Sequence, residues 1–369
     1  SVPVVIHSEE TAFVWTDAVD STQAETDSPP TAVVELTPEQ QEEEAMRAAY
    51  LEALRLWSVG EKVEARRALS KLEGPVDAAG VPKVWRRLIN MERVTAILTA
   101  KDNPASLMAV AFFHRDMFSW YLARRQMELA RHSWQMVAMM ARIAASRDSW
   151  DGADEFSECI LLDVASHLAQ TGQMRPAREV LMIAVKVAPK SSPALLGLGA
   201  LYERSGVLQE AFDEFETLNR TNPDHQEGRL RLAVNGSRLG RDKDAEELFR
   251  SLLSPSTSTW IRTVSYQELG RLLLRKDRVK EAEGILGAAM LQLPKNQRLP
   301  ILMAHALDRG QRPRGATAVI EDLDERGLRD TTSPRYRYSQ WPDLDRERVR
   351  ITLEESEEMG LAALRKALS

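Results

Sequence analysis

The residues that most often carry catalysis or bind metals are few in this chain and form no recognisable motif. The six histidines show no HExxH motif, no i,i+4 pair and no framing carboxylates. They are His7, His114, His132, His167, His225 and His305. The single cysteine, Cys159, has no histidine near it in the sequence, which favours burial over nucleophilic catalysis. Glycine-rich phosphate loops and the GxSxG motif are absent, so we expect no catalytic residue, no metal, no cofactor and no enzyme activity.

Arginine is the chemically active residue type that does recur at a regular spacing. Four arginines follow one another at nearly equal intervals, with Gln170 at the place before them: Arg204, Arg238, Arg275 and Arg309. A guanidinium group binds a carboxylate through paired, planar hydrogen bonds, so this row predicts a binding site for an acidic protein segment. A solvated arginine at such a place needs no ligand, and that interpretation stays open.

The elements that position these arginines are predicted to be helices. From Gln40 to Ser369, apolar residues recur at intervals of three and four, and short Gly, Asn or Pro breaks separate the segments. The first helix is expected to begin at Thr37 and Pro38, with Gln40 completing a capping box. The fold class is therefore all-α.

A repeat with a period of 34 residues runs through the second half of the chain. One alanine marks each unit, and a short insertion near 255–259 lengthens one interval to 37 residues. The marking residues are Ala177, Ala211, Ala245, Ala282 and Ala316. A small residue precedes each mark and a large apolar residue follows it, as Gly199 and Phe215 do around Ala211.

This spacing predicts a helical hairpin in every unit. The small residues let two helices approach closely, the large ones fill the seam, and Gly172, Gly206 and Gly240 make the turns. Because a lone hairpin cannot bury its outer face, the hairpins must stack into a solenoid. Five units are expected, over 158–191, 192–225, 226–259, 263–296 and 297–330.

The repeat resembles the tetratricopeptide repeat (TPR) family. Its clearest unit carries the family's signature residues Leu198, Gly199, Tyr202, Ala211, Phe215 and Pro223. A weaker unit lies at 46–79, and no unit has the tryptophan that is usual near the start of the family's first helix. The resemblance implies a right-handed superhelix whose first helices line a concave, peptide-binding groove. Arg231 and Arg271 are then expected on the same inner face as the arginine row.

Charge divides the chain into two opposite regions. Residues 1–46 contain 11 acidic and no basic side chains, whereas the remainder carries 49 basic and 44 acidic ones. We expect residues 1–36 to form an extended acidic arm that lies along the basic groove, or that pairs as a β-strand with another subunit. Residues 37–157 are expected to form degenerate helical hairpins, and 158–330 the five repeats.

The C-terminal region, 331–369, is expected to contain an aromatic and basic loop followed by a capping helix. The loop residues Arg335, Tyr336, Tyr338 and Trp341 are of the types that anchor protein interfaces. They are equally suited to cover the exposed edge of the last hairpin, since a solenoid end needs a cap. Asp345–Leu368 reads as an amphipathic closing helix.

These features favour a non-enzymatic scaffold or adaptor, a subunit or assembly factor of a larger complex, that binds an extended or acidic partner segment. The alternative is an RNA-binding array like pentatricopeptide or HAT proteins, against which stand the 34-residue period and the weakly basic body. Protein partners are expected, with no small-molecule substrate and no membrane span. We expect a soluble protein of an intracellular compartment. Any targeting segment is expected to have been removed from the chain, or never to have been present.

Overall fold

The computed structural model describes residues 37–70, 104–146, 152–325 and 341–368. Residues 45–369 form one compact unit, and residues 1–44 form another, of which only the start of the first helix is described. The acidic arm, residues 1–36, and the loop residues Arg335, Tyr336 and Tyr338 lie outside the described residues.

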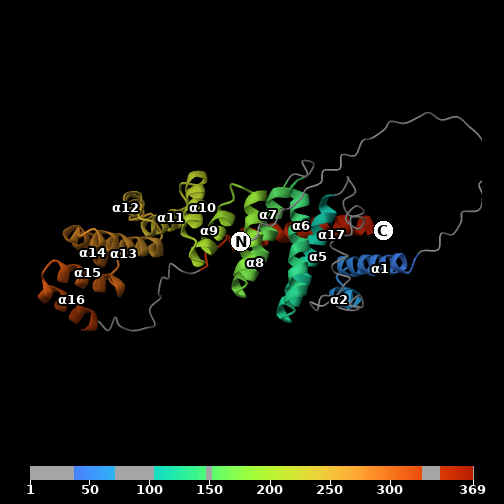
Figure 1. Cartoon of the computed structure of the whole chain (residues 1–369), viewed down its shortest axis with the longest axis horizontal. Helices are drawn as coiled ribbons and strands as arrows, with labels where there is room; N and C mark the ends of the chain where they lie inside the picture. Colours follow the sequence, from blue (N-terminus) through green and yellow to red (C-terminus); the bar gives the residue numbers. More distant parts are fainter. Residues whose placement is uncertain (1–36, 71–103, 147–151, 326–340, 369) are drawn as a thin grey trace, which may run out of the picture. The chain divides into compact units, whose positions relative to one another are not determined.

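The described residues confirm the all-α prediction, because every regular element among them is a helix (Figure 1). The first part of the chain contains α1 (Pro38–Ser58), α2 (Lys62–Ser70), α5 (Pro104–Ala123) and α6 (Met127–Ala145). The repeat region contains α7 (Ala153–Gln170), α8 (Met174–Val187), α9 (Ser192–Arg204), α10 (Leu208–Thr221), α11 (Gln226–Arg238), α12 (Asp242–Ser251), α13 (Thr259–Arg275), α14 (Val279–Gln292), α15 (Arg298–Arg309) and α16 (Pro313–Glu325). The last described helix is α17 (Arg346–Leu368).

Consecutive helices pack as hairpins. From α5 onward the pairs are α5–α6, α7–α8, α9–α10, α11–α12, α13–α14 and α15–α16, and each pair also contacts the next along the chain. The first helix of the first repeat begins at Ala153 and that of the fourth at Thr259, both earlier than the repeat spacing indicates. In the second case residues 259–262 add one turn to the start of α13.

Local sequence signals account for the helix ends. At the start of α1, the Thr37 amide donates to Gln40 Oε1 (2.9 Å) and the Gln40 amide donates to Thr37 Oγ1 (3.3 Å), which confirms the predicted capping box. Gly172, Gly206 and Gly240 turn between paired helices with φ of 83°, 75° and 80°, a left-handed conformation that glycine adopts without steric cost.

The seam between paired helices follows the repeat pattern. A Cβ atom on Gly199 would lie 2.6 Å from Phe215, and one on Gly270 would lie 2.8 Å from Leu286. The marking alanines from Ala177 to Ala282 are at most 1% exposed, whereas Ala316 in the last hairpin is partly exposed. As predicted, a small residue on one helix faces a large residue on the other, and this pairing sets the separation of the two helices in these seams.

Candidate functional site

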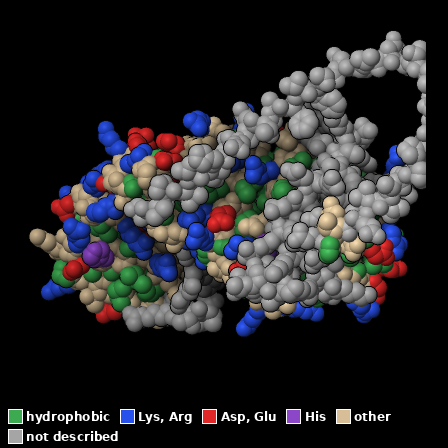
Figure 2. All heavy atoms as spheres, turned by 45° about the vertical axis from the view of Figure 1, so that its right-hand side comes forward, with side chains coloured by type: hydrophobic (Ala, Val, Ile, Leu, Met, Phe, Trp, Pro, Cys, Tyr) green, Lys and Arg blue, Asp and Glu red, His purple; other side chains and the backbone are tan. Residues whose placement is uncertain are grey.

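The arginine row lies at equivalent ends of successive helices. Arg204, Arg238, Arg275 and Arg309 are the last residues of α9, α11, α13 and α15, which are the first helices of their hairpins. A positive charge is favourable there because the carbonyl end of a helix carries partial negative charge. Figure 2 shows basic side chains spread over the described surface, with acidic side chains among them.

Three of these arginines reach back to the preceding hairpin. Arg238 Nη1 donates to Glu203 Oε1 on α9 at 2.9 Å. Arg275 Nη2 donates to Ser237 Oγ at 2.9 Å and to Asp242 Oδ1 at 2.6 Å. Hydrogen bonds from Lys276 and Arg275 lower the pKa of the Asp242 carboxyl, so it stays ionised and keeps this link charged.

The same link recurs in the last hairpin. Arg309 Nη1 donates to the Leu274 carbonyl oxygen at 2.8 Å, and Arg309 Nη2 donates to Asp277 Oδ1 at 3.1 Å. The side chains of Arg238, Arg275 and Arg309 are still 46%, 53% and 40% exposed. Because a guanidinium has five N–H donors, Arg275 and Arg309 can each hold the neighbouring hairpin and retain donors for a ligand.

Arg204 differs from the other three members of the row. It is exposed, and no described acidic side chain forms an ion pair with it. In the preceding unit the place of Glu203 is taken by Ala169, which offers no carboxylate. Arg204 is therefore the member of the row that forms no ion pair with a described residue.

The two further arginines expected on the inner face occupy different environments. Arg231 is 4% exposed, and its guanidinium is ion-paired with Glu203 (3.1 Å) and Glu227 (2.8 Å). Arg271 is half exposed and pairs with Glu268 on its own helix at 2.5 Å. Arg231 is thus a buried link between α9 and α11, whereas Arg271 stands at the surface.

The C-terminal helix lies where the sequence did not place it. α17 was expected to close the last hairpin, but it packs on α5 and α7 (Figure 1). Its Val349, Leu353 and Leu364 belong to the same hydrophobic core as α5 and α7. Trp341, just before the helix, is half-buried against that core as well. The helix is present as predicted, and its expected place as a cap is corrected.

The reason for this placement is visible in α5. All residues from Ser106 to His114 are buried, so this stretch needs cover on every side and not only from its hairpin partner α6. α17 supplies that cover with its apolar stripe. The apolar run of α5 was the available signal in the sequence, and it indicated an extra covering element without identifying α17.

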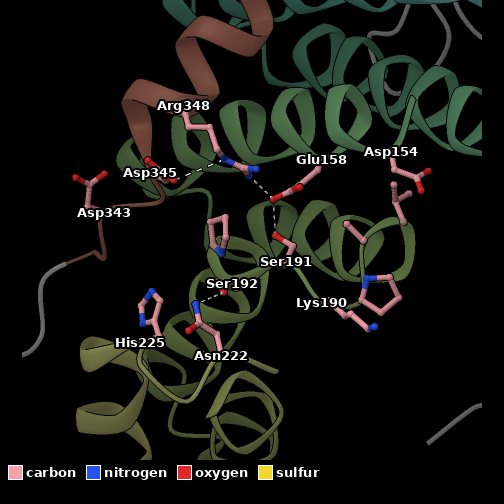
Figure 3. Close-up of a pocket in the computed structure, with 14 residues that line it drawn as sticks. Asp154, Glu158, Lys190, Ser191, Ser192, Asn222, His225, Asp343, Asp345 and Arg348 are labelled. Atoms are coloured by element: carbon pink, nitrogen blue, oxygen red, sulfur yellow. Dashed lines mark hydrogen bonds and ion pairs between the residues drawn. The ribbon is translucent and has the colours of Figure 1, made fainter. Parts of the chain in front are cut away.

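A cavity opens where the start of α17 meets the nearby ends of the hairpin helices from α7 to α11 (Figure 3). Its volume is about 860 Å³, and its wall includes Lys190, His225 and Asp343. At one side, Glu158 accepts hydrogen bonds from Ser191 Oγ (2.6 Å) and Arg348 Nη2 (2.7 Å). This arrangement fastens the first turn of α17 to α7 and to the start of α9.

Cys159 and His114 are of residue types often used in catalysis, but both occupy structural positions. Cys159 is fully buried beneath α17, and burial raises the pKa of its thiol to about 11, so it is a neutral thiol at neutral pH. His114 is buried beside the Tyr50 hydroxyl (2.7 Å), and burial lowers its pKa to about 3. No group of three or more His, Cys, Asp or Glu side chains that could hold a metal ion occurs in the described ranges.

None of the described helices is both long and apolar enough to cross a membrane. Searches of family models and of curated proteins give no match for this sequence.

Solved structures of repeat proteins are similar to this chain at low identity. A tetratricopeptide repeat protein from Parabacteroides merdae is 17% identical, with a TM-score of 0.46 over 70% of this chain and 98% of that one. MamA from Desulfovibrio magneticus is 14% identical, with a TM-score of 0.43 over 47% and 98%. YrrB, a TPR protein with an unusual peptide-binding site, is 16% identical, with a TM-score of 0.40 over 47% and 87%.

The fold assignment rests on the hairpins themselves, with their seam glycines, left-handed turns and order of packing. The described chain is an all-helical array of consecutive TPR-like hairpins, and TPR proteins are among its structural neighbours.

Proposed function

We propose that the chain is a non-enzymatic scaffold that binds segments of partner proteins on the face formed by the first helices of its hairpins. The observation that carries this proposal is the packing of α17 across α5 and α7, which are first helices. That face therefore already holds one helical segment. A rigid array lowers the ordering cost of such binding because the surface is preorganised.

The stretch proposed for a partner is the corresponding face of α9, α11, α13 and α15. It carries the exposed guanidiniums of Arg204, Arg271 and Arg275, among others. Carboxylates are the groups that guanidiniums hold best, so the favoured ligand is an acidic segment. A multi-subunit complex is the setting that this activity fits.

The acidic arm, residues 1–36, is a candidate occupant within the chain itself. Its seven carboxylates complement the arginine row, and no basic side chain among them weakens the attraction. If this segment competes with a partner, replacing its acids with Asn and Gln will increase partner capture. If it recruits the partner, the same replacement will reduce capture.

The experiment is capture from native extract with the full chain, identifying both bound proteins and bound RNA. The test variant changes Arg204, Arg238, Arg275 and Arg309 to Glu. The matched control reverses four exposed basic residues of the second helices, Lys186, Arg220, Lys243 and Lys280, and so has the same net charge. Circular dichroism checks that both variants keep their helix content.

We expect the test variant to lose the captured protein and the control variant to retain it. Arg204→Glu alone is expected to weaken capture too, and it removes no ion pair with a described residue. Equal capture by test and control variants contradicts the arginine row as the binding site. Capture dominated by nuclease-sensitive RNA contradicts the scaffold.

A further inference from the structure

α17 binds the array as a segment that is remote in sequence. The helices from α5 to α16 contact their neighbours along the chain, whereas α17 contacts α5 and α7. Its hydrogen bonds join residues 190 positions apart, Arg348 to Glu158, and 307 positions apart, Arg365 to the Ser58 carbonyl. A helix on a separate molecule can make the same contacts, because none of them depends on nearness along the chain.

The buried side of α17 is matched to α5 at a close crossing. Val349, Leu353 and Leu364 are at most 7% exposed and form one stripe. Gly360 lies in line with them, and a Cβ atom there would approach the Ala109 amide nitrogen to 3.0 Å and the Ala105 carbonyl oxygen to 3.2 Å. The interface therefore selects a small residue at this point, with apolar residues on either side.

Polar contacts fix the helix at both ends. Near the start, Arg348 Nη2 donates to Glu158 at 2.7 Å, and Glu158 is buried. Near the end, Arg365 Nε donates to the Ser58 carbonyl oxygen at 2.7 Å. These two contacts set the direction and the register of the bound helix.

The outer side of α17 is charged and supports the helix locally. Arg350 pairs with Glu347 and with Glu354, both at 2.7 Å and one turn away along α17. Pairs at this spacing stabilise a helix without help from neighbouring elements. α17 thus carries its own binding stripe, its own end contacts and part of its own helical stability.

We propose that the surface of α5 and α7 beneath α17 is a helix-binding site that also accepts α17 from a second copy of the chain, so that two chains exchange their C-terminal helices. The second copy is the occupant because its helix carries the same stripe, glycine and end contacts. In the sequence, residues 326–345 separate α16 from α17. The proposal deepens the proposed function, since it treats the first helices as a binding face, but its test uses neither the arginine row nor a partner protein.

Cys159 provides a built-in reporter of this site. It is the one cysteine of the chain, it is fully buried, and Thr352 of α17 lies within hydrogen-bonding reach of its thiol. Departure of α17 uncovers the thiol, so its rate of reaction with a maleimide measures how often the site is empty. Circular dichroism in the same samples separates local departure from unfolding.

The test exchanges the charges of the buried pair between two full-length variants. In Glu158→Arg and in Arg348→Glu, each chain's own α17 faces a like charge, so thiol labelling should become about 10-fold faster or more in each variant alone. When the two variants are mixed, each α17 meets an opposite charge only on the other chain. We expect the mixture to form a heterodimer of twice the 41.5 kDa chain mass and to regain slow labelling.

The control is the chain with both changes, in which the pair is restored within one molecule. It should label slowly and should not dimerise with either single variant. A mixture that stays monomeric and labels as fast as its components overturns the proposal.

A second measurement decides the matter if Glu158→Arg does not fold. A free peptide of residues 341–369 is added to the full-length Gly360→Leu variant, whose own helix is displaced by the clash with α5. Protection of Cys159 by this peptide, and not by the peptide carrying Gly360→Leu, supports the site. Absence of protection overturns it, as does labelling of the wild-type chain that has the same denaturant dependence as global unfolding.

Discussion

Gly199 of α9 and Phe215 of α10 meet so closely that a single added methyl group would lie 2.6 Å from the Phe215 ring. The contact closes the seam of one hairpin, and Gly270 with Leu286 repeats it in another. The glycine in each contact has no side chain, and this absence lets the paired helices approach closely. Stability should respond to this contact with a definite sign.

Gly199→Ala should destabilise the protein by about 1–3 kcal/mol, because the added methyl overpacks the seam. Gly284→Ala is the matched control, since a Cβ at Gly284 has no neighbour within 4 Å. The control should stabilise the protein by about 0.5–1 kcal/mol through the loss of glycine's chain entropy. Urea unfolding measures both changes, and equal effects would contradict the seam argument.

Two turns test the cost of the left-handed conformation. Gln311 adopts φ of 57° at the turn where Gly240 of an earlier unit has φ of 80°. Gln311→Gly should gain up to about 1 kcal/mol, because relief of the left-handed strain exceeds the entropy cost of glycine. Gly240→Ala should lose about 1 kcal/mol for the opposite reason. Thermal unfolding should shift in opposite directions for the two variants.

The buried ion-pair network between α9 and α11 should be sensitive to truncation. Arg231→Ala leaves the nearly buried Glu203 carboxylate with one partner fewer, so we expect a loss of about 3 kcal/mol. Arg250→Ala, which removes partly exposed pairs with Glu246 and Glu281, should cost less than about 1 kcal/mol. Similar costs in urea unfolding would show that burial of the network contributes nothing.

Stability should fall on mild acidification because of His114. Burial lowers the pKa of this residue to about 3, whereas the unfolded chain binds the proton near the ordinary histidine pKa of 6.5. The unfolded state therefore binds more protons below pH 6.5, and stability that is complete above that pH is lost as the pH falls toward 3. Between pH 7 and pH 5 the loss should be about 2 kcal/mol from this group.

The window from pH 7 to pH 5 lies above the range in which the carboxyls of Asp242 and Glu246 titrate, because both pKa values are lowered by ion pairing. His225, whose pKa is lowered by burial, adds a loss of the same sign. His114→Gln should make the pH dependence of urea unfolding shallower. An unchanged slope in this variant would contradict a neutral, buried His114.

The local parts of this fold were predictable from sequence because they depend on residues that lie close together in the chain. The capping box at Thr37, the turn glycines and the match of Gly199 to Phe215 each depend on positions within one hairpin. The left-handed turn at Gln311 was not predictable in the same way, because the glycine of this turn, Gly310, lies one position before the left-handed residue. There the surrounding hairpin imposes the conformation against residue preference.

The candidate surface was predictable only in part. The arginine row was found from its spacing, but the links from Arg238 to Glu203 and from Arg275 to Asp242 depend on how successive hairpins are offset, which the spacing does not specify. The apolar stripe of α17 predicted that one side of the helix is buried, but it did not predict which helices cover that side. The pairing of Arg348 with Glu158 spans the whole repeat array, and no local pattern encodes it.

The central claim is that partner segments bind the face of the first helices, and photo-crosslinking tests it most directly. A photoreactive residue would replace Arg271 on α13 in one full-length chain and Lys280 on α14 in another; both positions are exposed. Crosslinks to the captured protein from position 271, with none or far fewer from position 280, are the expected result. Crosslinks from position 280 with none from 271 would place the partner on the second helices and contradict the account.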